Sequence, residues 1–206
     1  MSERTRRITL IGSVAGYVVA VAGAAGLVTI GAYSSGDLWG TLNDLARLVM
    51  TAAIAPLMLS YYEMGGWFPL RLAQAAQTLG WLSCLAWCVV QRLIVVGPVT
   101  LDYGHPAVSA LAVEAWATVY IGLWIVGANI VAGGWLPWIR WIGLAAGIGT
   151  ALMGYGLLVD GTASPWTSPA GAGSQVLLPI WAFLMARHLG HISATGGVAS
   201  RQLGHT

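Results

Sequence analysis

The sequence predicts an all-α integral membrane bundle of about six transmembrane helices, with the N- and C-termini in the cytoplasm. The first observation is a run of 25 residues without charge between Arg7 and Tyr33, followed by several similar runs. The second is a composition that is 57% hydrophobic and only 8% charged, whereas soluble domains carry roughly 25% charged residues. At about 20 residues per crossing, a chain of 206 residues has room for one such bundle and no second domain.

Turn-forming residues divide the chain into its apolar segments. Breaks such as Gly65-Gly66 and Gly97-Pro98 interrupt the runs, as expected between helices. The helices are predicted at residues 8–32, 41–62, 70–96, 107–132, 138–159 and 175–192. A single domain therefore covers residues 1–192, and the polar segment 193–206 is predicted to be a disordered cytoplasmic tail. The Gly-, Ser- and Pro-rich segment Gly161–Ser174 is predicted to be the longest outer loop, either a lid over the outer mouth or a plain surface loop.

The arginine distribution predicts the orientation. With the N-terminus inside, seven of the nine Arg residues lie on the cytoplasmic side, and only Arg47 and Arg92 lie toward the outside. Cytoplasmic segments of membrane proteins carry such an excess of basic residues. We therefore expect a multi-pass protein of the cell membrane, in a bacterium the inner membrane. Its expected partners are the bilayer and a lipid or lipophilic small molecule; a net charge of +2 gives no reason to expect a nucleic acid.

Four charged residues are predicted at similar depth in the outer half of the membrane: Asp44, Arg47, Arg92 and Glu114. Asp44 and Arg47 are three residues apart and share a helix face, and Glu114 lies roughly 10 Å below the outer start of its helix. Isolated charges are costly at that depth, so we expect these groups to pair. Two interpretations stay open, a structural ion-pair network and a functional site open to the outer leaflet. Arg92, near its helix end, could instead extend to the membrane surface.

The third predicted helix carries a semi-polar stripe on one face. Three- and four-residue spacing aligns Gln74, Gln77, Trp81, Cys84, Cys88 and Gln91, and such a face is expected to turn toward the bundle interior. Pro56 in the second helix predicts a kink, since proline frees a backbone carbonyl. Together these features predict an internal cavity. The two cysteines are interpreted as packing residues, and no metal or cofactor is expected.

These groups suggest an enzyme that acts on a lipophilic, isoprenoid- or terpenoid-like substrate in a pocket open to the outer leaflet. Glu114 and Asp44 are the predicted catalytic carboxylates, because a positioned carboxyl group can donate or accept a proton. Tryptophan faces can stabilise cationic intermediates, so cyclisation or isomerisation fits the set. The predicted substrate-binding residues are Asn43, Arg47, Gln91, Arg92, Trp81 and Trp116. The alternative is a non-catalytic small transporter, lipid-binding protein or accessory membrane subunit.

Two stretches resemble a known group of proteins. Trp39–Pro56 contains Leu42-Asn43-Asp44-Leu45, and Tyr120–Leu158 contains Gly-Leu-Trp, Gly-Gly-Trp-Leu-Pro-Trp and Trp-Ile-Gly-Leu-Ala-Ala-Gly. Over about half the chain they resemble bacterial six-helix membrane proteins grouped as a domain of unknown function. This resemblance implies a fold and no activity. Membrane terpene cyclases use chemistry comparable to the reaction suggested above, although this chain lacks their acidic-aromatic motif. The Gly-x-Ser-x-Gly and His-Glu-x-x-His signatures do not occur in the sequence.

Overall fold

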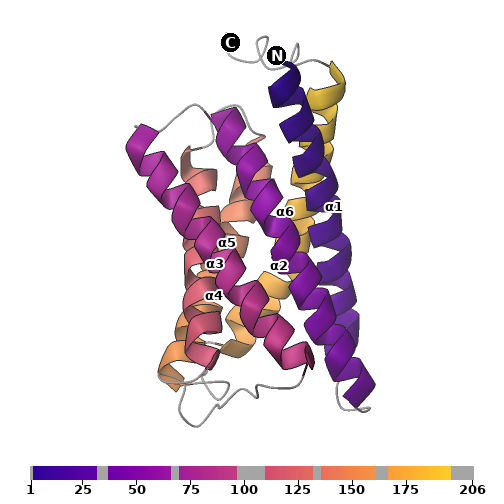
Figure 1. The fold of residues 1–206 in the computed structure, drawn as a ribbon, viewed down its shortest axis with the longest axis vertical. Coiled ribbons are helices and arrows are strands. Elements are labelled where there is room, and N and C mark those ends of the chain that lie inside the picture. The colour runs from indigo at the N-terminus through magenta and orange to yellow at the C-terminus, as the bar shows by residue number, and fades with distance from the viewer. Residues whose placement is uncertain are drawn as a thin grey trace.

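The computed structural model describes residues 2–31, 37–65, 70–96, 110–131, 136–160 and 167–195, and these residues form an all-α bundle (Figure 1). Its helices are α1 (Glu3–Gly31), α2 (Asp37–Gly65), α3 (Leu70–Val96), α4 (Ala110–Val131), α5 (Pro137–Asp160) and α6 (Thr167–Thr195). Within this part of the chain, all of them except α3 contain a segment long and apolar enough to cross a membrane. In α3 the apolar segment is shorter, Ala76–Val90. The predicted multi-pass helical bundle is confirmed.

The helices are arranged as a ring. Each helix packs against its neighbours in the sequence, and α6 returns to pack against α1. The first residues of α1 and the last residues of α6 lie at the same end of the bundle, as an even number of crossings requires (Figure 1). Which end faces the cytoplasm stays a prediction from the arginine distribution.

Side chains of alternate helices fill the centre of the ring. The buried cluster joins α2, α4 and α6 through Leu57, Met58, Tyr61, Ile121, Ile125, Trp181, Met185 and Leu189. Lipid tails are as apolar as these side chains, so close packing and hydrogen bonds must distinguish the interior from the lipid face. Contacts across the ring, in addition to those around it, therefore position the polar groups described below.

Small residues bring the helix backbones close together. A Cβ atom at Gly16 in α1 would lie 2.8 Å from the carbonyl oxygen of Ala182 in α6. A Cβ atom at Gly147 in α5 would lie 2.8 Å from the carbonyl oxygen of Gly122 in α4. Both distances are too short for a real carbon contact, so only glycine permits these helix crossings.

Hydroxyl groups add hydrogen bonds between α1 and its two neighbours, α6 and α2. The Oγ of Ser13 donates to the carbonyl of Ala186 at 2.8 Å, which joins α1 to α6. The Oγ of Ser60 donates to the carbonyl of Ile8 at 2.7 Å, which joins α2 to α1. Where no water is available, an unpaired hydroxyl group would destabilise the bundle, and these hydrogen bonds pair it.

The start of the last helix differs from the prediction. The sequence placed a loop over Gly161–Ser174 and a helix from residue 175, but α6 already begins at Thr167 and is 29 residues long. Pro169 lies in the first turn, where a proline needs no hydrogen bond from its nitrogen, and an apolar surrounding favours helix over exposed backbone. The loop prediction was therefore wrong for residues 167–174, and residues 161–166 lie outside the described residues. Of the predicted tail, residues 193–195 belong to α6, and the rest also lies outside the described part.

Candidate functional site

A buried ion pair connects α2 to α4 across the ring. The Nη2 of Arg47 donates to the Oε1 of Glu114 at 2.7 Å. The side chain of Glu114 is 2% exposed and that of Arg47 is 21% exposed. A hydrogen bond of this length between two charged groups is among the stronger ones in proteins. Two of the charges predicted to share a depth therefore form a direct contact.

Trp87 adds α3 to this pair. The guanidinium carbon of Arg47 lies 5.8 Å from the centre of the Trp87 indole ring, within the range of a cation–π interaction. Trp87 is itself only 2% exposed. We call Arg47, Trp87 and Glu114 the ion-pair cluster.

Three buried polar atoms of the ion-pair cluster have no hydrogen-bond partner within the described part of the chain. They are the Nε of Arg47, the Nε1 of Trp87 and the Oε2 of Glu114. Buried polar atoms are nearly always paired, because an unpaired one retains its full desolvation cost. Two of these atoms donate and one accepts. A hydroxyl group or a water molecule, which can both accept and donate, has the chemistry to pair with them.

Each charged residue has a threonine one turn further along its helix that bonds to its backbone carbonyl. The Oγ1 of Thr51 donates to the carbonyl of Arg47 at 2.9 Å, and the Oγ1 of Thr118 donates to the carbonyl of Glu114 at 2.7 Å. Each threonine lies one turn after the charged residue. These bonds satisfy the threonine hydroxyls inside their own helices, so neither threonine competes for the ion pair.

Two other predicted residues of α2 have different surroundings. Asp44 is half-buried, and its charge interacts with that of Arg47 on the same helix. Asn43 is buried, but its Nδ2 donates to the carbonyl of Gly26 at 3.0 Å and to the Oγ1 of Thr29 at 3.1 Å. The structure thus places Asn43 in the α1–α2 interface and not in the ion-pair cluster.

Of the remaining predicted residues, those whose side chains the structure describes do not join the cluster. Trp81 is 42% exposed and Trp116 is 54% exposed, so their rings lie on the outer surface of the bundle. Arg92 is also exposed, and the Gln91 side chain lies outside the described residues. The tryptophan in the site is instead Trp87. Because it lies three residues after Cys84, helical spacing could have identified it.

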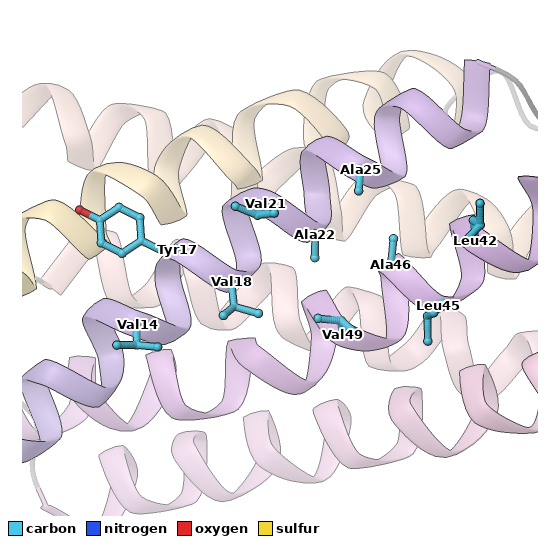
Figure 2. Close-up of a pocket in the computed structure, with 10 residues that line it drawn as sticks. All are labelled: Val14, Tyr17, Val18, Val21, Ala22, Ala25, Leu42, Leu45, Ala46 and Val49. Atoms are coloured by element: carbon cyan, nitrogen blue, oxygen red, sulfur yellow. The ribbon is translucent and has the colours of Figure 1, made fainter.

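A groove lies on the other side of α2 from the ion-pair cluster. It has a volume of about 570 Å³ and is formed by α1 and α2 alone, as Figure 2 shows. Its lining consists of Val14, Tyr17, Val18, Val21, Ala22, Ala25, Leu42, Leu45, Ala46 and Val49. Leu45 and Val49 are four residues apart and face the groove, whereas Arg47 midway between them points to α4. This α1–α2 groove is therefore apolar and separate from the charged site that the sequence predicted inside the bundle.

A second polar cluster surrounds Asn129 on α4. Its Oδ1 accepts from the hydroxyl of Tyr61 at 3.4 Å and from the Nε1 of Trp181 at 3.3 Å. Its Nδ2 donates to the carbonyl of Ile125 at 2.8 Å. These bonds connect α2, α4 and α6 at the centre of the ring. The sequence analysis did not identify this Asn129 cluster.

Arg140 on α5 closes the end of α4 beside that cluster. Its Nε donates to the carbonyl of Asn129 at 2.9 Å and its Nη2 donates to the carbonyl of Ile130 at 2.8 Å. These carbonyls belong to the last turn of α4, where no further turn is present to pair with them. A cation at a helix C-terminus also interacts favourably with the helix dipole. Arg140 thus caps the C-terminus of α4, in addition to being one of the arginines that predict the orientation in the membrane.

Comparison with family models, with curated proteins and with solved structures gives no match for this chain. The resemblance to six-helix proteins of unknown function therefore stays a hypothesis. What the described residues do show is a multi-pass helical membrane bundle with a buried Arg47–Glu114 pair at its centre.

Proposed function

We propose that this chain is an integral membrane enzyme that transfers a proton to or from a lipophilic, isoprenoid- or terpenoid-like substrate at Glu114. The reaction classes that fit are isomerisation, in which one carbon–hydrogen bond breaks, another forms and a double bond moves, and cyclisation, in which the same proton transfers accompany the formation of a carbon–carbon bond from a double bond. The observation that supports this proposal is the state of the Glu114 carboxyl group. One oxygen is bound by Arg47, and the other is buried and without a partner in the described structure.

Each residue of the ion-pair cluster has a role in this proposal. Arg47 holds Oε1 and thereby orients the carboxylate, leaving Oε2 to accept a proton from the substrate. Trp87 holds the Arg47 guanidinium over its ring. Asp44, whose charge interacts with that of Arg47, is the second carboxylate and would accept the proton at the more exposed side. The proton, directly or after exchange with water through Asp44, is then returned to another carbon of the substrate, so that a double bond moves, the substrate loses no net proton and Glu114 is again a carboxylate.

The partial exposure of Arg47 marks the side from which a substrate could approach. Arg47 lies between the buried carboxylate and the surface of the bundle, because 21% of its side chain remains exposed while Glu114 is covered. Under the orientation predicted from the arginines, this exposed part of Arg47 faces the outer half of the membrane. A substrate with an apolar chain and a hydroxyl group could reach it from the lipid phase.

Deuterium incorporation tests this function directly. The purified protein in liposomes is incubated in D₂O with farnesol, geranylgeraniol or squalene, and the extracted molecules are analysed by mass spectrometry. Wild type should introduce deuterium into at least one of them, and Glu114→Gln should not. Glu3→Gln, which changes an exposed Glu of α1, is the matched control and should behave like wild type. Equal labelling by wild type and Glu114→Gln, or no labelling by wild type of any probe, would overturn the proposal.

A second candidate function is a lipid-binding protein without catalysis. The α1–α2 groove favours it, because a volume of about 570 Å³ lies within the range of ligand sites and the lining is apolar. For this candidate, lipid should co-purify with the protein and should be lost when the groove is filled, whatever residue stands at 114. The enzyme therefore requires Arg47 on the side of α2 that faces α4, whereas the lipid-binding protein requires the side of α2 that lines the groove.

A further inference from the structure

A pair of sulfur atoms lies in the interior of the bundle, between α2 and α3. The Sγ of Cys84 is 4.0 Å from the Sδ of Met58. Both side chains are buried, and neither Cys84 nor Cys88 forms a disulfide. None of these residues belongs to the ion-pair cluster or to the Asn129 cluster.

A third sulfur lies one turn away on the same face of α3. Cys88 follows Cys84 by four residues, which places their side chains next to each other on the helix. Gly80 lies one turn before Cys84 on the same face. A Cβ atom there would lie 3.2 Å from the Met58 sulfur, so the missing side chain gives the thioether room against α3.

We propose that Met58, Cys84 and Cys88 form a binding site for a soft monovalent metal ion, of which Cu(I) is the biological example. Thiolate and thioether sulfurs are the ligands that select Cu(I), whereas carboxylate, imidazole and water suit harder ions. Within the described residues, no group of three or more His, Cys, Asp and Glu side chains is placed to hold a metal ion. The sulfur site is therefore of a different chemical class from a zinc or magnesium site.

The distance between the two sulfurs fits this coordination. Two metal–sulfur bonds of about 2.3 Å that span a gap of 4.0 Å enclose an angle of about 120°. That angle corresponds to trigonal coordination, which needs one further ligand in the same plane. Cys88, on the same face of α3, is the residue available to supply it. Burial of Cys84 and Met58 keeps water, the competing hard ligand, away from the ion.

Binding is an exchange of a proton for a metal ion. The S–H bond of each cysteine that becomes a ligand breaks, a metal–sulfur bond forms, and the proton is released to the buffer. The Met58 thioether donates a lone pair and loses no proton. No electron is transferred, so the site needs no oxidant or reductant when the metal is supplied as a monovalent ion.

The competing explanation is that these residues only fill space, since buried Cys and Met are common packing residues. The two explanations differ at Met58. A leucine there keeps the shape and apolar character but removes the sulfur. Packing alone therefore predicts that Met58→Leu has little effect on metal affinity, whereas coordination predicts a clear loss.

Silver ion is the probe, because Ag(I) has the soft character of Cu(I) and does not change its oxidation state. Affinity is measured on the full-length protein in detergent by competition with a chelator, and stoichiometry by elemental analysis. We expect one ion per chain and a loss of roughly tenfold or more in Met58→Leu, at least as large as the change seen when a supporting residue of a metal site is removed. Met185→Leu, at another buried methionine, should match wild type.

Two further variants complete the test. Cys84→Ser should abolish tight binding. The double variant Arg47→Met, Glu114→Leu, which removes both charges of the ion pair and leaves neither unpaired, should bind silver as wild type does, which separates this site from the proposed catalytic one. X-ray absorption should show sulfur-only coordination in both complexes, at about 2.3 Å for copper, as for other metal–thiolate bonds, and at a longer distance for the larger silver ion. Equal affinity of Met58→Leu and wild type, or binding of more than one ion with no dependence on Cys84, would overturn the proposal.

Discussion

Arg47 and Glu114 are separated by 67 positions in the chain, yet their side chains meet at 2.7 Å between α2 and α4. Because Glu114 is almost fully covered, its carboxylate has no water available as a substitute partner, whereas 21% of the Arg47 side chain remains exposed. Removing one member leaves the other as an uncompensated charge in an apolar surrounding. The pair therefore links the stability of the bundle to the chemistry proposed for Glu114.

Glu114→Gln should destabilise the protein and abolish its activity. An unpaired buried guanidinium costs about 3–5 kcal/mol of unfolding free energy, measurable by denaturant unfolding in detergent. The double variant Arg47→Met, Glu114→Leu removes both charges and should recover most of this stability, but not the activity. If Glu114→Gln instead keeps both its unfolding midpoint and full activity, neither the ion-pair nor the catalytic interpretation of Glu114 can stand.

Trp181→Phe should reveal the contribution of the Asn129 cluster. The substitution removes the indole donor at 3.3 Å from the Oδ1 of Asn129, and the lost bond and smaller ring should together cost about 1–3 kcal/mol. The matched control is Trp116→Phe, at an exposed tryptophan, which should be close to neutral. Thermal unfolding of both variants compares them, and equal midpoints would show that the Asn129 cluster adds no stability.

Gly147→Ala should weaken the α4–α5 interface. Its Cβ would lie 2.8 Å from the carbonyl oxygen of Gly122, so the helices must separate at a cost of about 1–3 kcal/mol. Gly127→Ala is the control, because nothing lies within 4 Å of a Cβ at that position and alanine favours helix there. The midpoint of unfolding should fall for the first variant and stay or rise for the second. The opposite order would contradict the packing described for these glycines.

Ala46→Phe should reduce lipid occupancy of the α1–α2 groove. Ala46 lines the groove, and a phenyl ring there occupies space that a lipid chain would use. Electron paramagnetic resonance of spin-labelled lipid measures the immobilised fraction, which should fall in this variant. Ala145→Phe, at an exposed position of α5, should leave that fraction unchanged. A loss of equal size in both variants would mean that the groove is no preferred lipid site.

Cysteine labelling in whole cells tests the orientation. Single cysteines replace Asp102 or Ser200 in a chain whose Cys84 and Cys88 have been changed to Ala. A membrane-impermeant thiol reagent should label position 102 and not position 200, because the arginine asymmetry predicts cytoplasmic termini. Labelling at 200 without labelling at 102 would reverse the topology.

The sequence predicted the membrane bundle, and it predicted pairing among Asp44, Arg47, Arg92 and Glu114, for one physical reason; the structure pairs Arg47 with Glu114 and leaves Arg92 exposed. Charged side chains are so costly inside a membrane that they stand out from a background of apolar residues, and their depth follows from helix geometry. Depth alone could not show that Asn43 turns to α1 while Arg47 turns to α4. That information depends on how the helices are rotated against each other.

The burial of the tryptophans and the helical state of the glycine-rich segment before residue 175 could not be predicted from the sequence. In water an apolar side chain identifies the buried face of a helix, but in lipid both faces are apolar. The stripe of the third helix therefore predicted that Trp81 faces the interior, but Trp81 is exposed, and Trp87, which the stripe did not include, is buried. The run Gly171–Ser174 likewise has the composition of a loop, yet the structure places it in α6. Local composition was overridden there by the need to pair backbone groups within the membrane.

The contact between α1 and α6 also has a consequence for biogenesis. Gly16 and Gly23 of α1 face Ala182 and Pro179 of α6, so α1 packs against a helix that leaves the ribosome well after it. Until α6 is inserted, the face of α1 that carries Gly16 and Gly23 is exposed to lipid or to an insertase. A chain that stops before Thr167 lacks α6 and cannot close the ring. The uncovered face of α1 is then a surface by which a membrane protease could recognise the unfinished protein.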